Sequence, residues 1–134
     1  MKPAKEHGKG WDQRRAAEEG EGEKGETALK ELQERFGEDK VCFVPCDVTK
    51  DEEFRNLFDK AEEHFKVGCV DILANNAGIN VNFGWRKCMD INIMAVMNGT
   101  EIALERMNKA GKPCQIINTA SLGTTFIYKL FHCM

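Results

Sequence analysis

Apolar residues recur at intervals of three or four positions in three stretches of the sequence, at about residues 26–36, 49–65 and 85–109. That spacing places them on one face of an α-helix, so the pattern predicts three helices. The second helix is expected to begin at Thr49, because Glu52 follows three positions later as in a capping box. The third stretch is apolar over much of its circumference, which predicts burial on more than one side.

Three short apolar runs precede or follow these helices, at residues 41–44, 70–74 and 115–121. They are too short for typical helices and contain many β-branched residues, so each is predicted to be a strand. Strands that alternate with helices of this length form parallel β-α-β units. The sequence therefore predicts an α/β fold, a partial doubly wound parallel sheet with three strands and three helices.

The two ends of the chain differ in composition from this central region. Residues 1–25 are charged and rich in glycine and glutamate, and they show no hydrophobic period, so they are predicted to be disordered. Residues 124–134 form a short aromatic tail without turn residues, which we interpret as lying outside the domain. One domain is therefore expected at residues 26–123.

Length and charge narrow the classes of partner and compartment. The 134 residues fit a single domain, and the net charge of -3 gives no reason to expect nucleic acid or an acidic membrane as a partner. No apolar run approaches the length of a membrane span, and no apolar stretch of a signal peptide follows the first residues. We therefore expect a cytoplasmic protein.

The six cysteines are expected to be reduced and to pack as small apolar residues, because no secretory signal accompanies them. Cys42 and Cys46 are separated by three residues within an apolar run, and no histidine is close to them in sequence. That arrangement does not match the spacing of metal ligands. No metal site is predicted.

Polar residues or glycines follow each predicted strand at its carboxyl end. Cys46-Asp47-Val48 comes just past the first strand, Asn75-Asn76-Ala77-Gly78 follows the second, and Ser121 ends the third. Taken singly, each has an ordinary explanation as a turn or as a strand-end hydroxyl. The carboxyl ends of parallel strands meet at one edge of the sheet, where ligands bind, so the three together predict a binding site.

The segment Asp71–Asn80, with its Asn-Asn-Ala-Gly turn, is the most informative part of the chain. Together with Ile116–Leu122 at the end of the third strand, it makes the sequence from about residue 23 to 123 resemble the short-chain dehydrogenase/reductase family. Asn80, Trp85 and Asn98-Gly99-Thr100 are similar to the branch of that family that acts on prostaglandins.

The resemblance implies a Rossmann-like fold and an oxidoreductase activity. The reaction would transfer a hydride from a secondary alcohol of a prostaglandin or hydroxy fatty acid, a small-molecule lipid, to NAD. Asp47, flanked by Cys46 and Val48, would accept a hydrogen bond from the adenine amino group. Asn76-Ala77-Gly78 would border the cofactor ribose, where glycine allows the backbone to approach closely.

The resemblance also implies two catalytic residues. Asn92 would interrupt the long helix and hold a water in the proton relay, and Ser121 would hydrogen-bond the substrate oxygen that becomes a carbonyl. The family's base is a tyrosine with a lysine four residues later, which lowers the tyrosine pKa. In this sequence Tyr128 is followed at that spacing by His132, so the base motif is absent.

The family's glycine-rich, phosphate-binding turn has no counterpart either. Gly8 and Gly10 flank Lys9, but no strand precedes them and no apolar helix follows. In the strand order 3-2-1-4-5 of this fold the predicted strands match three, four and five, so the first two strands and the C-terminal half are missing. The alternative interpretation is a catalytically inactive truncated isoform or fragment, which forms a homodimer, or a heterodimer with a full-length subunit, through the helix at residues 85–109.

Overall fold

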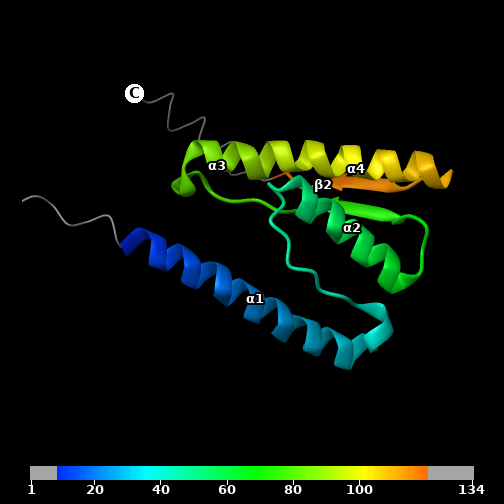
Figure 1. Cartoon of the computed structure of the whole chain (residues 1–134), viewed down its shortest axis with the longest axis horizontal. Coiled ribbons are helices and arrows are strands. Elements are labelled where there is room, and N and C mark those ends of the chain that lie inside the picture. The colour runs from blue at the N-terminus through cyan, green and yellow to red at the C-terminus, as the bar shows by residue number, and fades with distance from the viewer. Residues whose placement is uncertain (1–8, 121–134) are drawn as a thin grey trace, which may run out of the picture.

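The structure, a computed structural model, describes residues 9–120, with side chains for residues 22–80 and 82–120. Two α-helices precede the first strand, and an interrupted helix separates the two strands (Figure 1). In order the elements are α1 Lys9–Phe36, η1 Glu38–Lys40, α2 Asp51–Phe65, β1 Ile72–Asn75, η2 Val81–Phe83, α3 Trp85–Met89, η3 Asp90–Met94, α4 Ala95–Ala110 and β2 Gln115–Asn118. The two strands are parallel neighbours, so the predicted α/β class with a parallel sheet is confirmed.

The sheet pairs β1 with β2 in register, so that Asn75 lies opposite Asn118. One further backbone bond extends the ladder, because Thr119 N–H donates to the Asn75 carbonyl at 3.0 Å. The interrupted helix α3–η3–α4 connects the two strands, as the crossover of a β-α-β unit requires. Both strands therefore end at the same edge of the sheet, where the predicted polar turns follow them.

The core lies between the sheet and the two helices α2 and α4. Phe54 and Phe58 of α2, with ring centres 5.9 Å apart, pack against Ile102 and Ala103 of α4, and none of the four is more than 5% exposed. Partly buried residues from the strands and their flanks complete this core: Cys46, Val48, Leu57, Val70, Leu73, Cys114 and Ile116. Burying one large apolar side chain contributes about 1.5–3 kcal/mol, so this cluster is a main source of stability.

Charged side chains tie α2 to α4 at the border of the core. Arg106 donates to Asp59 Oδ1 at 2.7 Å and to Glu62 Oε2 at 2.6 Å, and its guanidinium lies 5.3 Å from the centre of the Phe58 ring. The side chains of Arg106 and Glu62 are only 18% and 15% exposed. Charge-assisted bonds of this kind are directional and poorly screened by water, so they favour one register of α4 against α2.

The opposite face of the sheet leaves apolar side chains open to solvent. Ile72 is 58% exposed and Ile117 is 51% exposed. α1 lies apart from the sheet (Figure 1) and packs against η1 and Phe43. A Cβ at Gly25 would come within 2.2 Å of the Phe43 ring, so the missing side chain is what lets the ring lie on this helix.

The segment predicted as the first strand, residues 41–44, pairs with no strand in the described part of the chain. The prediction of three strands is therefore wrong for residues 9–120, which contain two. Apolar and β-branched residues indicate that a segment can form a strand. A strand exists only beside a hydrogen-bonded neighbour, however, and no described segment provides one for residues 41–44.

The structure describes residues 9–25 as the first part of α1, whereas the disorder expected for residues 1–25 stays a prediction. The segment is rich in alanine, arginine, glutamate and lysine, which are strong helix formers. Residues 1–8 and 121–134 lie outside the described residues, so the division into domains and the interpretation of residues 124–134 stay predictions.

The long helix predicted at residues 85–109 extends from Trp85 to Ala110 and changes its geometry once. One π-helical turn, η3, separates α3 from α4, and Asn92 lies at its centre. Gly111 ends α4 in the left-handed conformation, with φ at 62°, which a glycine adopts without strain. The helix is thus interrupted at Asn92, as the sequence leads one to expect.

Gly99 of α4 provides a test of this packing. A Cβ at this position would lie 2.6 Å from Asn75 Oδ1 and 2.8 Å from Phe54 Cζ. Both neighbours are buried and cannot move away freely, so we expect Gly99→Ala to lower the free energy of unfolding by about 1–3 kcal/mol. Urea denaturation followed by circular dichroism measures the change.

Gly22 of α1 offers the matched control. No atom lies within 4 Å of a Cβ built there, so Gly22→Ala adds a better helix former without a clash. This control is expected to raise stability or helix content by up to about 1 kcal/mol. Equal effects of the two substitutions would contradict the close packing at Gly99.

Candidate functional site

Asp47 occupies a turn just before α2. Its Oδ1 accepts hydrogen bonds from the Thr49 N–H at 3.0 Å and from the Thr49 hydroxyl at 2.7 Å. Its own N–H donates to the Glu53 carboxylate at 2.8 Å. These three bonds, all within six residues of sequence, hold the Asp47 carboxylate in place at the carboxyl end of the 41–46 segment.

The same bonds correct the expected start of α2. The helix begins at Asp51 rather than Thr49, and its N-cap Lys50 makes no side-chain cap bond. Glu53, and not Glu52, reaches back to a free backbone N–H. The capping box predicted from the spacing is therefore wrong, because Thr49 uses its hydroxyl to close the turn around the aspartate.

The environment of Asp47 favours its charged form. Partial burial raises the pKa of Asp47, but the hydrogen bonds from Thr49 and the charges of Lys50 and Lys87 outweigh it, and the pKa lies below its usual value. The side chain is 45% exposed, and Oδ2 is 3.7 Å from Lys50 Nζ. An ionised carboxylate has acceptor sites for several N–H groups, so Asp47 can accept a further hydrogen bond from a ligand.

The residues on either side of Asp47 anchor the turn to the core. Cys46 and Val48 are both partly buried against the Phe54 and Phe58 cluster. Burial raises the pKa of the Cys46 thiol, and the nearby charges of Glu53 and Asp47 raise it further, which keeps the thiol neutral. Among the described residues none accepts a hydrogen bond from Val48 N–H, and this donor directly follows Asp47 in the chain.

Asn75 ends β1 and is only 7% exposed. Its side-chain amide donates to Asn118 Oδ1 at 2.9 Å and lies 3.4 Å from both Thr100 Oγ1 and the Val96 carbonyl. The Thr100 hydroxyl in turn donates to that carbonyl at 2.8 Å. A buried amide without partners costs about 1–3 kcal/mol, so these bonds select one arrangement of β1, β2 and α4.

Asn92 clips the turn after β1 to the interrupted helix. Its Oδ1 accepts a hydrogen bond from Ile79 N–H at 2.8 Å, and its Nδ2 donates to the Ile79 carbonyl at 2.9 Å. The Cys88 thiol lies 3.5 Å from the same carbonyl. The amide thus pairs with the backbone of Ile79 as a neighbouring strand would, and it holds η3 against the segment that follows Asn75.

The three residues predicted to border a cofactor, Asn76-Ala77-Gly78, are exposed at this edge. A Cβ at Gly78 would lie 3.5 Å from Asn92 Oδ1, so the turn passes close to η3. The structure therefore brings this turn together with Asn92. Ser121, and Tyr128 with His132, lie outside the described residues.

Sequence reasoning gives no separate role to Asn75 or Lys87. A sequence signal for Asn75 exists, because Asn75 and Asn118 end the two strands β1 and β2. In the parallel register of the sheet these two asparagines lie opposite each other. No sequence signal could reveal that the charge of Lys87 acts on Asp47, since the two residues are 40 positions apart and only the fold brings Lys87 near enough to act. Long-range electrostatics of this kind follows from the fold.

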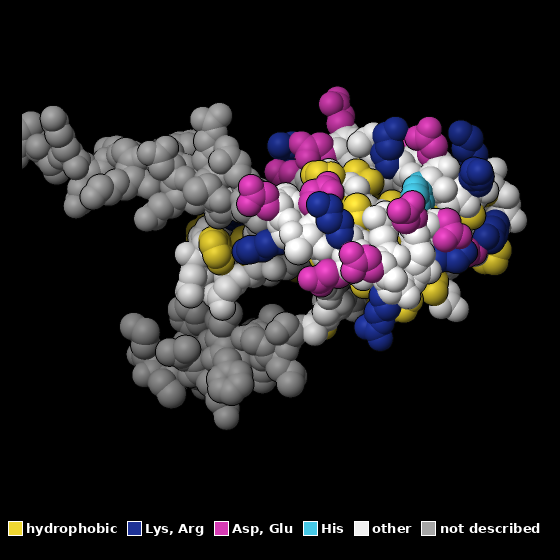
Figure 2. All heavy atoms as spheres, turned by 90° about the horizontal axis from the view of Figure 1, so that it is seen from below, with side chains coloured by type: hydrophobic (Ala, Val, Ile, Leu, Met, Phe, Trp, Pro, Cys, Tyr) yellow, Lys and Arg dark blue, Asp and Glu magenta, His cyan; other side chains and the backbone are white. Residues whose placement is uncertain are grey.

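The remaining surface is of mixed charge. Figure 2 shows acidic and basic side chains interspersed over the face of the molecule that it presents. None of the described helices combines the length and the apolar content that a membrane span needs. The five described cysteines carry free thiols, and no three metal-ligating side chains converge within the described residues.

The fold and this edge of the sheet together define a class of protein. The sequence profile of short chain dehydrogenases matches residues 13–132, which is most of the chain. The chain therefore belongs to the short-chain dehydrogenase family, a family of oxidoreductases. The matched range extends beyond residues 23–123, the part of the chain that resembles the family in its motifs.

Individual relatives agree with this assignment. The chain is 41% identical over 93 residues to 15-hydroxyprostaglandin dehydrogenase [NAD(+)] of Homo sapiens, covering 68% of this chain and 34% of that protein. It is 35% identical over 106 residues to the NADP-dependent (R)-specific alcohol dehydrogenase of Lentilactobacillus kefiri, covering 73% and 40%. The chain thus spans about a third of the length of the curated prostaglandin dehydrogenases it matches.

Solved structures give the same result. A short-chain dehydrogenase structure from Novosphingobium aromaticivorans superposes with a TM-score of 0.63 and 31% identity, covering 72% of this chain and 39% of the other. An alcohol dehydrogenase structure from Thermococcus sibiricus, with a TM-score of 0.54 and 22% identity, shares the fold.

We expect Thr49→Val to raise the pKa of Asp47, because valine removes the hydroxyl that donates to Oδ1. The lowered pKa means that the turn stabilises the fold at neutral pH and loses this contribution as the pH falls through the folded-state pKa. In Thr49→Val the loss begins at higher pH. Carboxyl carbon NMR shifts recorded over the acid range measure the titration.

Thr27→Val is the matched control for Asp47. The Thr27 hydroxyl donates to the Glu23 carbonyl at 2.9 Å within α1, away from the turn. The substitution removes the same chemical group and is expected to leave the Asp47 titration unchanged. An unchanged titration in Thr49→Val as well would show that the hydroxyl does not stabilise the carboxylate.

Asn92→Leu removes both hydrogen bonds to Ile79 while keeping a side chain of similar size. One net hydrogen bond contributes about 1 kcal/mol, so the Ile79 amide is expected to exchange with solvent about fivefold faster. Hydrogen exchange followed by NMR gives the rate. Asn82→Leu, at a neighbouring exposed asparagine, serves as control and should leave the Ile79 rate unchanged.

Proposed function

We propose that this chain forms the adenine-binding edge and the Asn92 region of an NAD-dependent dehydrogenase that oxidises a secondary alcohol of a prostaglandin or hydroxy fatty acid. The 41% identity to 15-hydroxyprostaglandin dehydrogenase [NAD(+)] over 93 residues carries this proposal. The pair of hydrogen bonds between Asn92 and Ile79 at the carboxyl edge of the sheet supports it, because these bonds hold η3 against the turn proposed to border the cofactor.

The groups at this edge fit the adenine end of a dinucleotide. Asp47 offers an ionised acceptor to an exocyclic amino group, and the neighbouring Val48 N–H offers a donor to a ring nitrogen. Asn76-Ala77-Gly78 would line the ribose, and Gly78 leaves the backbone open there. NAD, when bound, supplies the carbon that accepts the hydride.

The catalytic proposal assigns roles to two residues of this chain. Asn92, held in η3, would bind a water that relays the proton of the substrate hydroxyl. Ser121 would donate a hydrogen bond to the substrate oxygen as it becomes a carbonyl oxygen. The base that takes the hydroxyl proton has no match at the Tyr128 and His132 spacing, and we propose that another segment supplies it.

A second candidate function is a catalytically inactive member of the family. The mismatch at Tyr128 favours it, because the base of the family is a tyrosine with a lysine four residues later, and His132 stands at that position here. In that case the chain would act by pairing, as a homodimer or with a full-length subunit, through the helix at residues 85–109. A chimeric enzyme separates the two candidates.

The test replaces the aligned segment of a full-length 15-hydroxyprostaglandin dehydrogenase with residues 26–123 of this chain. We expect the chimera to form NADH with prostaglandin substrate. Asn92→Leu in the chimera should lower kcat by about a hundredfold, the size of a lost proton-transfer contribution. Asp47→Asn should raise the KM for NAD with a smaller effect on kcat.

Asn82→Leu is the control in the chimera and should leave both constants unchanged. A chimera that folds and binds NAD, yet forms no NADH, would contradict the proposed dehydrogenase function and favour the inactive candidate. If Asn92→Leu lowers only the affinity for NAD, the proton-relay role is wrong while the family function stands.

A further inference from the structure

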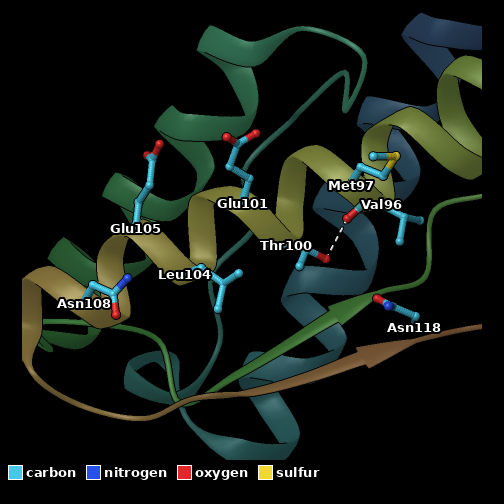
Figure 3. Close-up of a pocket in the computed structure, with 8 residues that line it drawn as sticks. All are labelled: Val96, Met97, Thr100, Glu101, Leu104, Glu105, Asn108 and Asn118. Atoms are coloured by element: carbon cyan, nitrogen blue, oxygen red, sulfur yellow. Dashed lines mark hydrogen bonds between the residues drawn. The ribbon is translucent and has the colours of Figure 1, made fainter.

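A groove of about 490 Å³ runs along α4 beside the end of β2 (Figure 3). Val96, Met97, Thr100 and Leu104 of α4 form its floor, and Asn118 of β2 forms one wall. Met97 is 62% exposed and Leu104 is 43% exposed. An apolar surface of this kind on a helix needs an occupant, because exposed apolar area is unfavourable in water.

The chain itself leaves the sheet at this groove. β2 ends at Asn118, whose side chain bonds Asn75, and Asn75 lies within 3.4 Å of Val96 and Thr100. The residues after Asn118 therefore start at the Val96 end of the groove. Sixteen residues follow Asn118 in the sequence, the difference between 134 and 118.

The composition of those residues suits the groove. Residues 124–134 carry large apolar side chains in more than half of their positions: Phe126, Ile127, Tyr128, Leu130, Phe131 and Met134. Residues 119–134 include Lys129 and His132 and no acidic residue. The segment is thus apolar with a weakly basic character.

The rim of the groove is acidic. Glu101 and Glu105 line it, and Figure 3 shows their carboxylates projecting from α4 on the side away from the strands. Arg55 of α2 pairs with Glu105 at 2.7 Å. The groove therefore presents an apolar floor and a carboxylate rim to a segment that presents apolar side chains and a lysine.

The lengths also agree. From Val96 to Asn108 the groove follows thirteen residues of α4, which span about 18 Å at the helical rise of 1.5 Å per residue. Sixteen residues reach up to about 50 Å when extended, so the segment can enter at Val96 and run the whole length. A segment tethered next to its site has an effective concentration of about a millimolar, which a second chain at ordinary dilution does not reach.

We propose that residues 124–134 bind in the α4 groove, with their apolar side chains on Met97 and Leu104 and Lys129 near the carboxylate rim. The tail then covers the apolar face of α4 that a second copy of the chain or another subunit would otherwise use. Residues 124–134 thus act as an intramolecular ligand of α4. Their removal exposes the apolar face of α4 to a second copy of the chain or another subunit.

Methionine oxidation by hydrogen peroxide tests the proposal on the full chain. Met89 of α3 is 48% exposed and does not line the groove, so it is the internal reference for Met97. With the groove covered, Met97 is expected to oxidise about tenfold more slowly than Met89, as measured by peptide mass spectrometry. The triple variant Phe126→Ser, Ile127→Ser, Phe131→Ser should bring the Met97 rate up to that of Met89.

Equal rates at Met97 and Met89 in the unaltered chain overturn the proposal. A second measurement identifies the occupant: a photo-crosslinking residue in place of Leu104, in a mixture of nitrogen-15-labelled and unlabelled chains. Crosslinks from position 104 to residues 124–134 within isotopically pure chains support the proposal. Crosslinks that mix the two isotopes show that a second copy fills the groove, and the proposal is then wrong.

Discussion

Asn75 places a polar amide at the end of β1 where water hardly reaches it, and the architecture around the candidate site follows from satisfying that amide. Its bonds to Asn118, Thr100 and Val96 fix the ends of both strands against α4. Gly99 keeps the helix close enough for those bonds to form, because any side chain there would overlap the amide. One buried group therefore couples the sheet register to the position of the crossover helix.

The interrupted helix that connects the two strands also carries Asn92. The position of the exposed Asn92 side chain therefore depends on the contacts of the buried Asn75 side chain. Asn75 holds α4, and η3 at the start of α4 presents Asn92 to Ile79 in the turn just beyond Asn75. The π-helical turn shifts the face that the helix presents, as such turns do at many functional sites. The ionic contacts of Arg106 fix the other end of α4 against α2, which carries the Asp47 turn at its start.

In the described residues, helices cover one face of the sheet and leave the other face exposed to solvent. α2 and α4 bury the Phe54 and Ile102 cluster, whereas Ile72 and Ile117 face solvent on the opposite side. The chain spans about a third of its curated relatives, and in the proposed function its edge of the sheet would bind the adenine and present Asn92. The proposed docking of residues 124–134 would add cover to the helical layer without closing the sheet.

The sequence by itself determined the buried stripe of α2, the approximate positions of β1 and β2 and the family of the chain, because hydrophobic periods and the Asn75–Gly78 turn are local signals. It also located the interruption at Asn92. It did not determine the buried face of α4: burial on more than one side was expected, and Met97 and Leu104 are exposed in the described residues. Only the tertiary structure decided that residues 41–44 lack a strand partner, that Glu53 rather than Glu52 caps the turn, and that Lys87 acts on Asp47. Each of these depends on what lies next to a residue in space, and a strand, a cap or a charge interaction exists only when its partner is there.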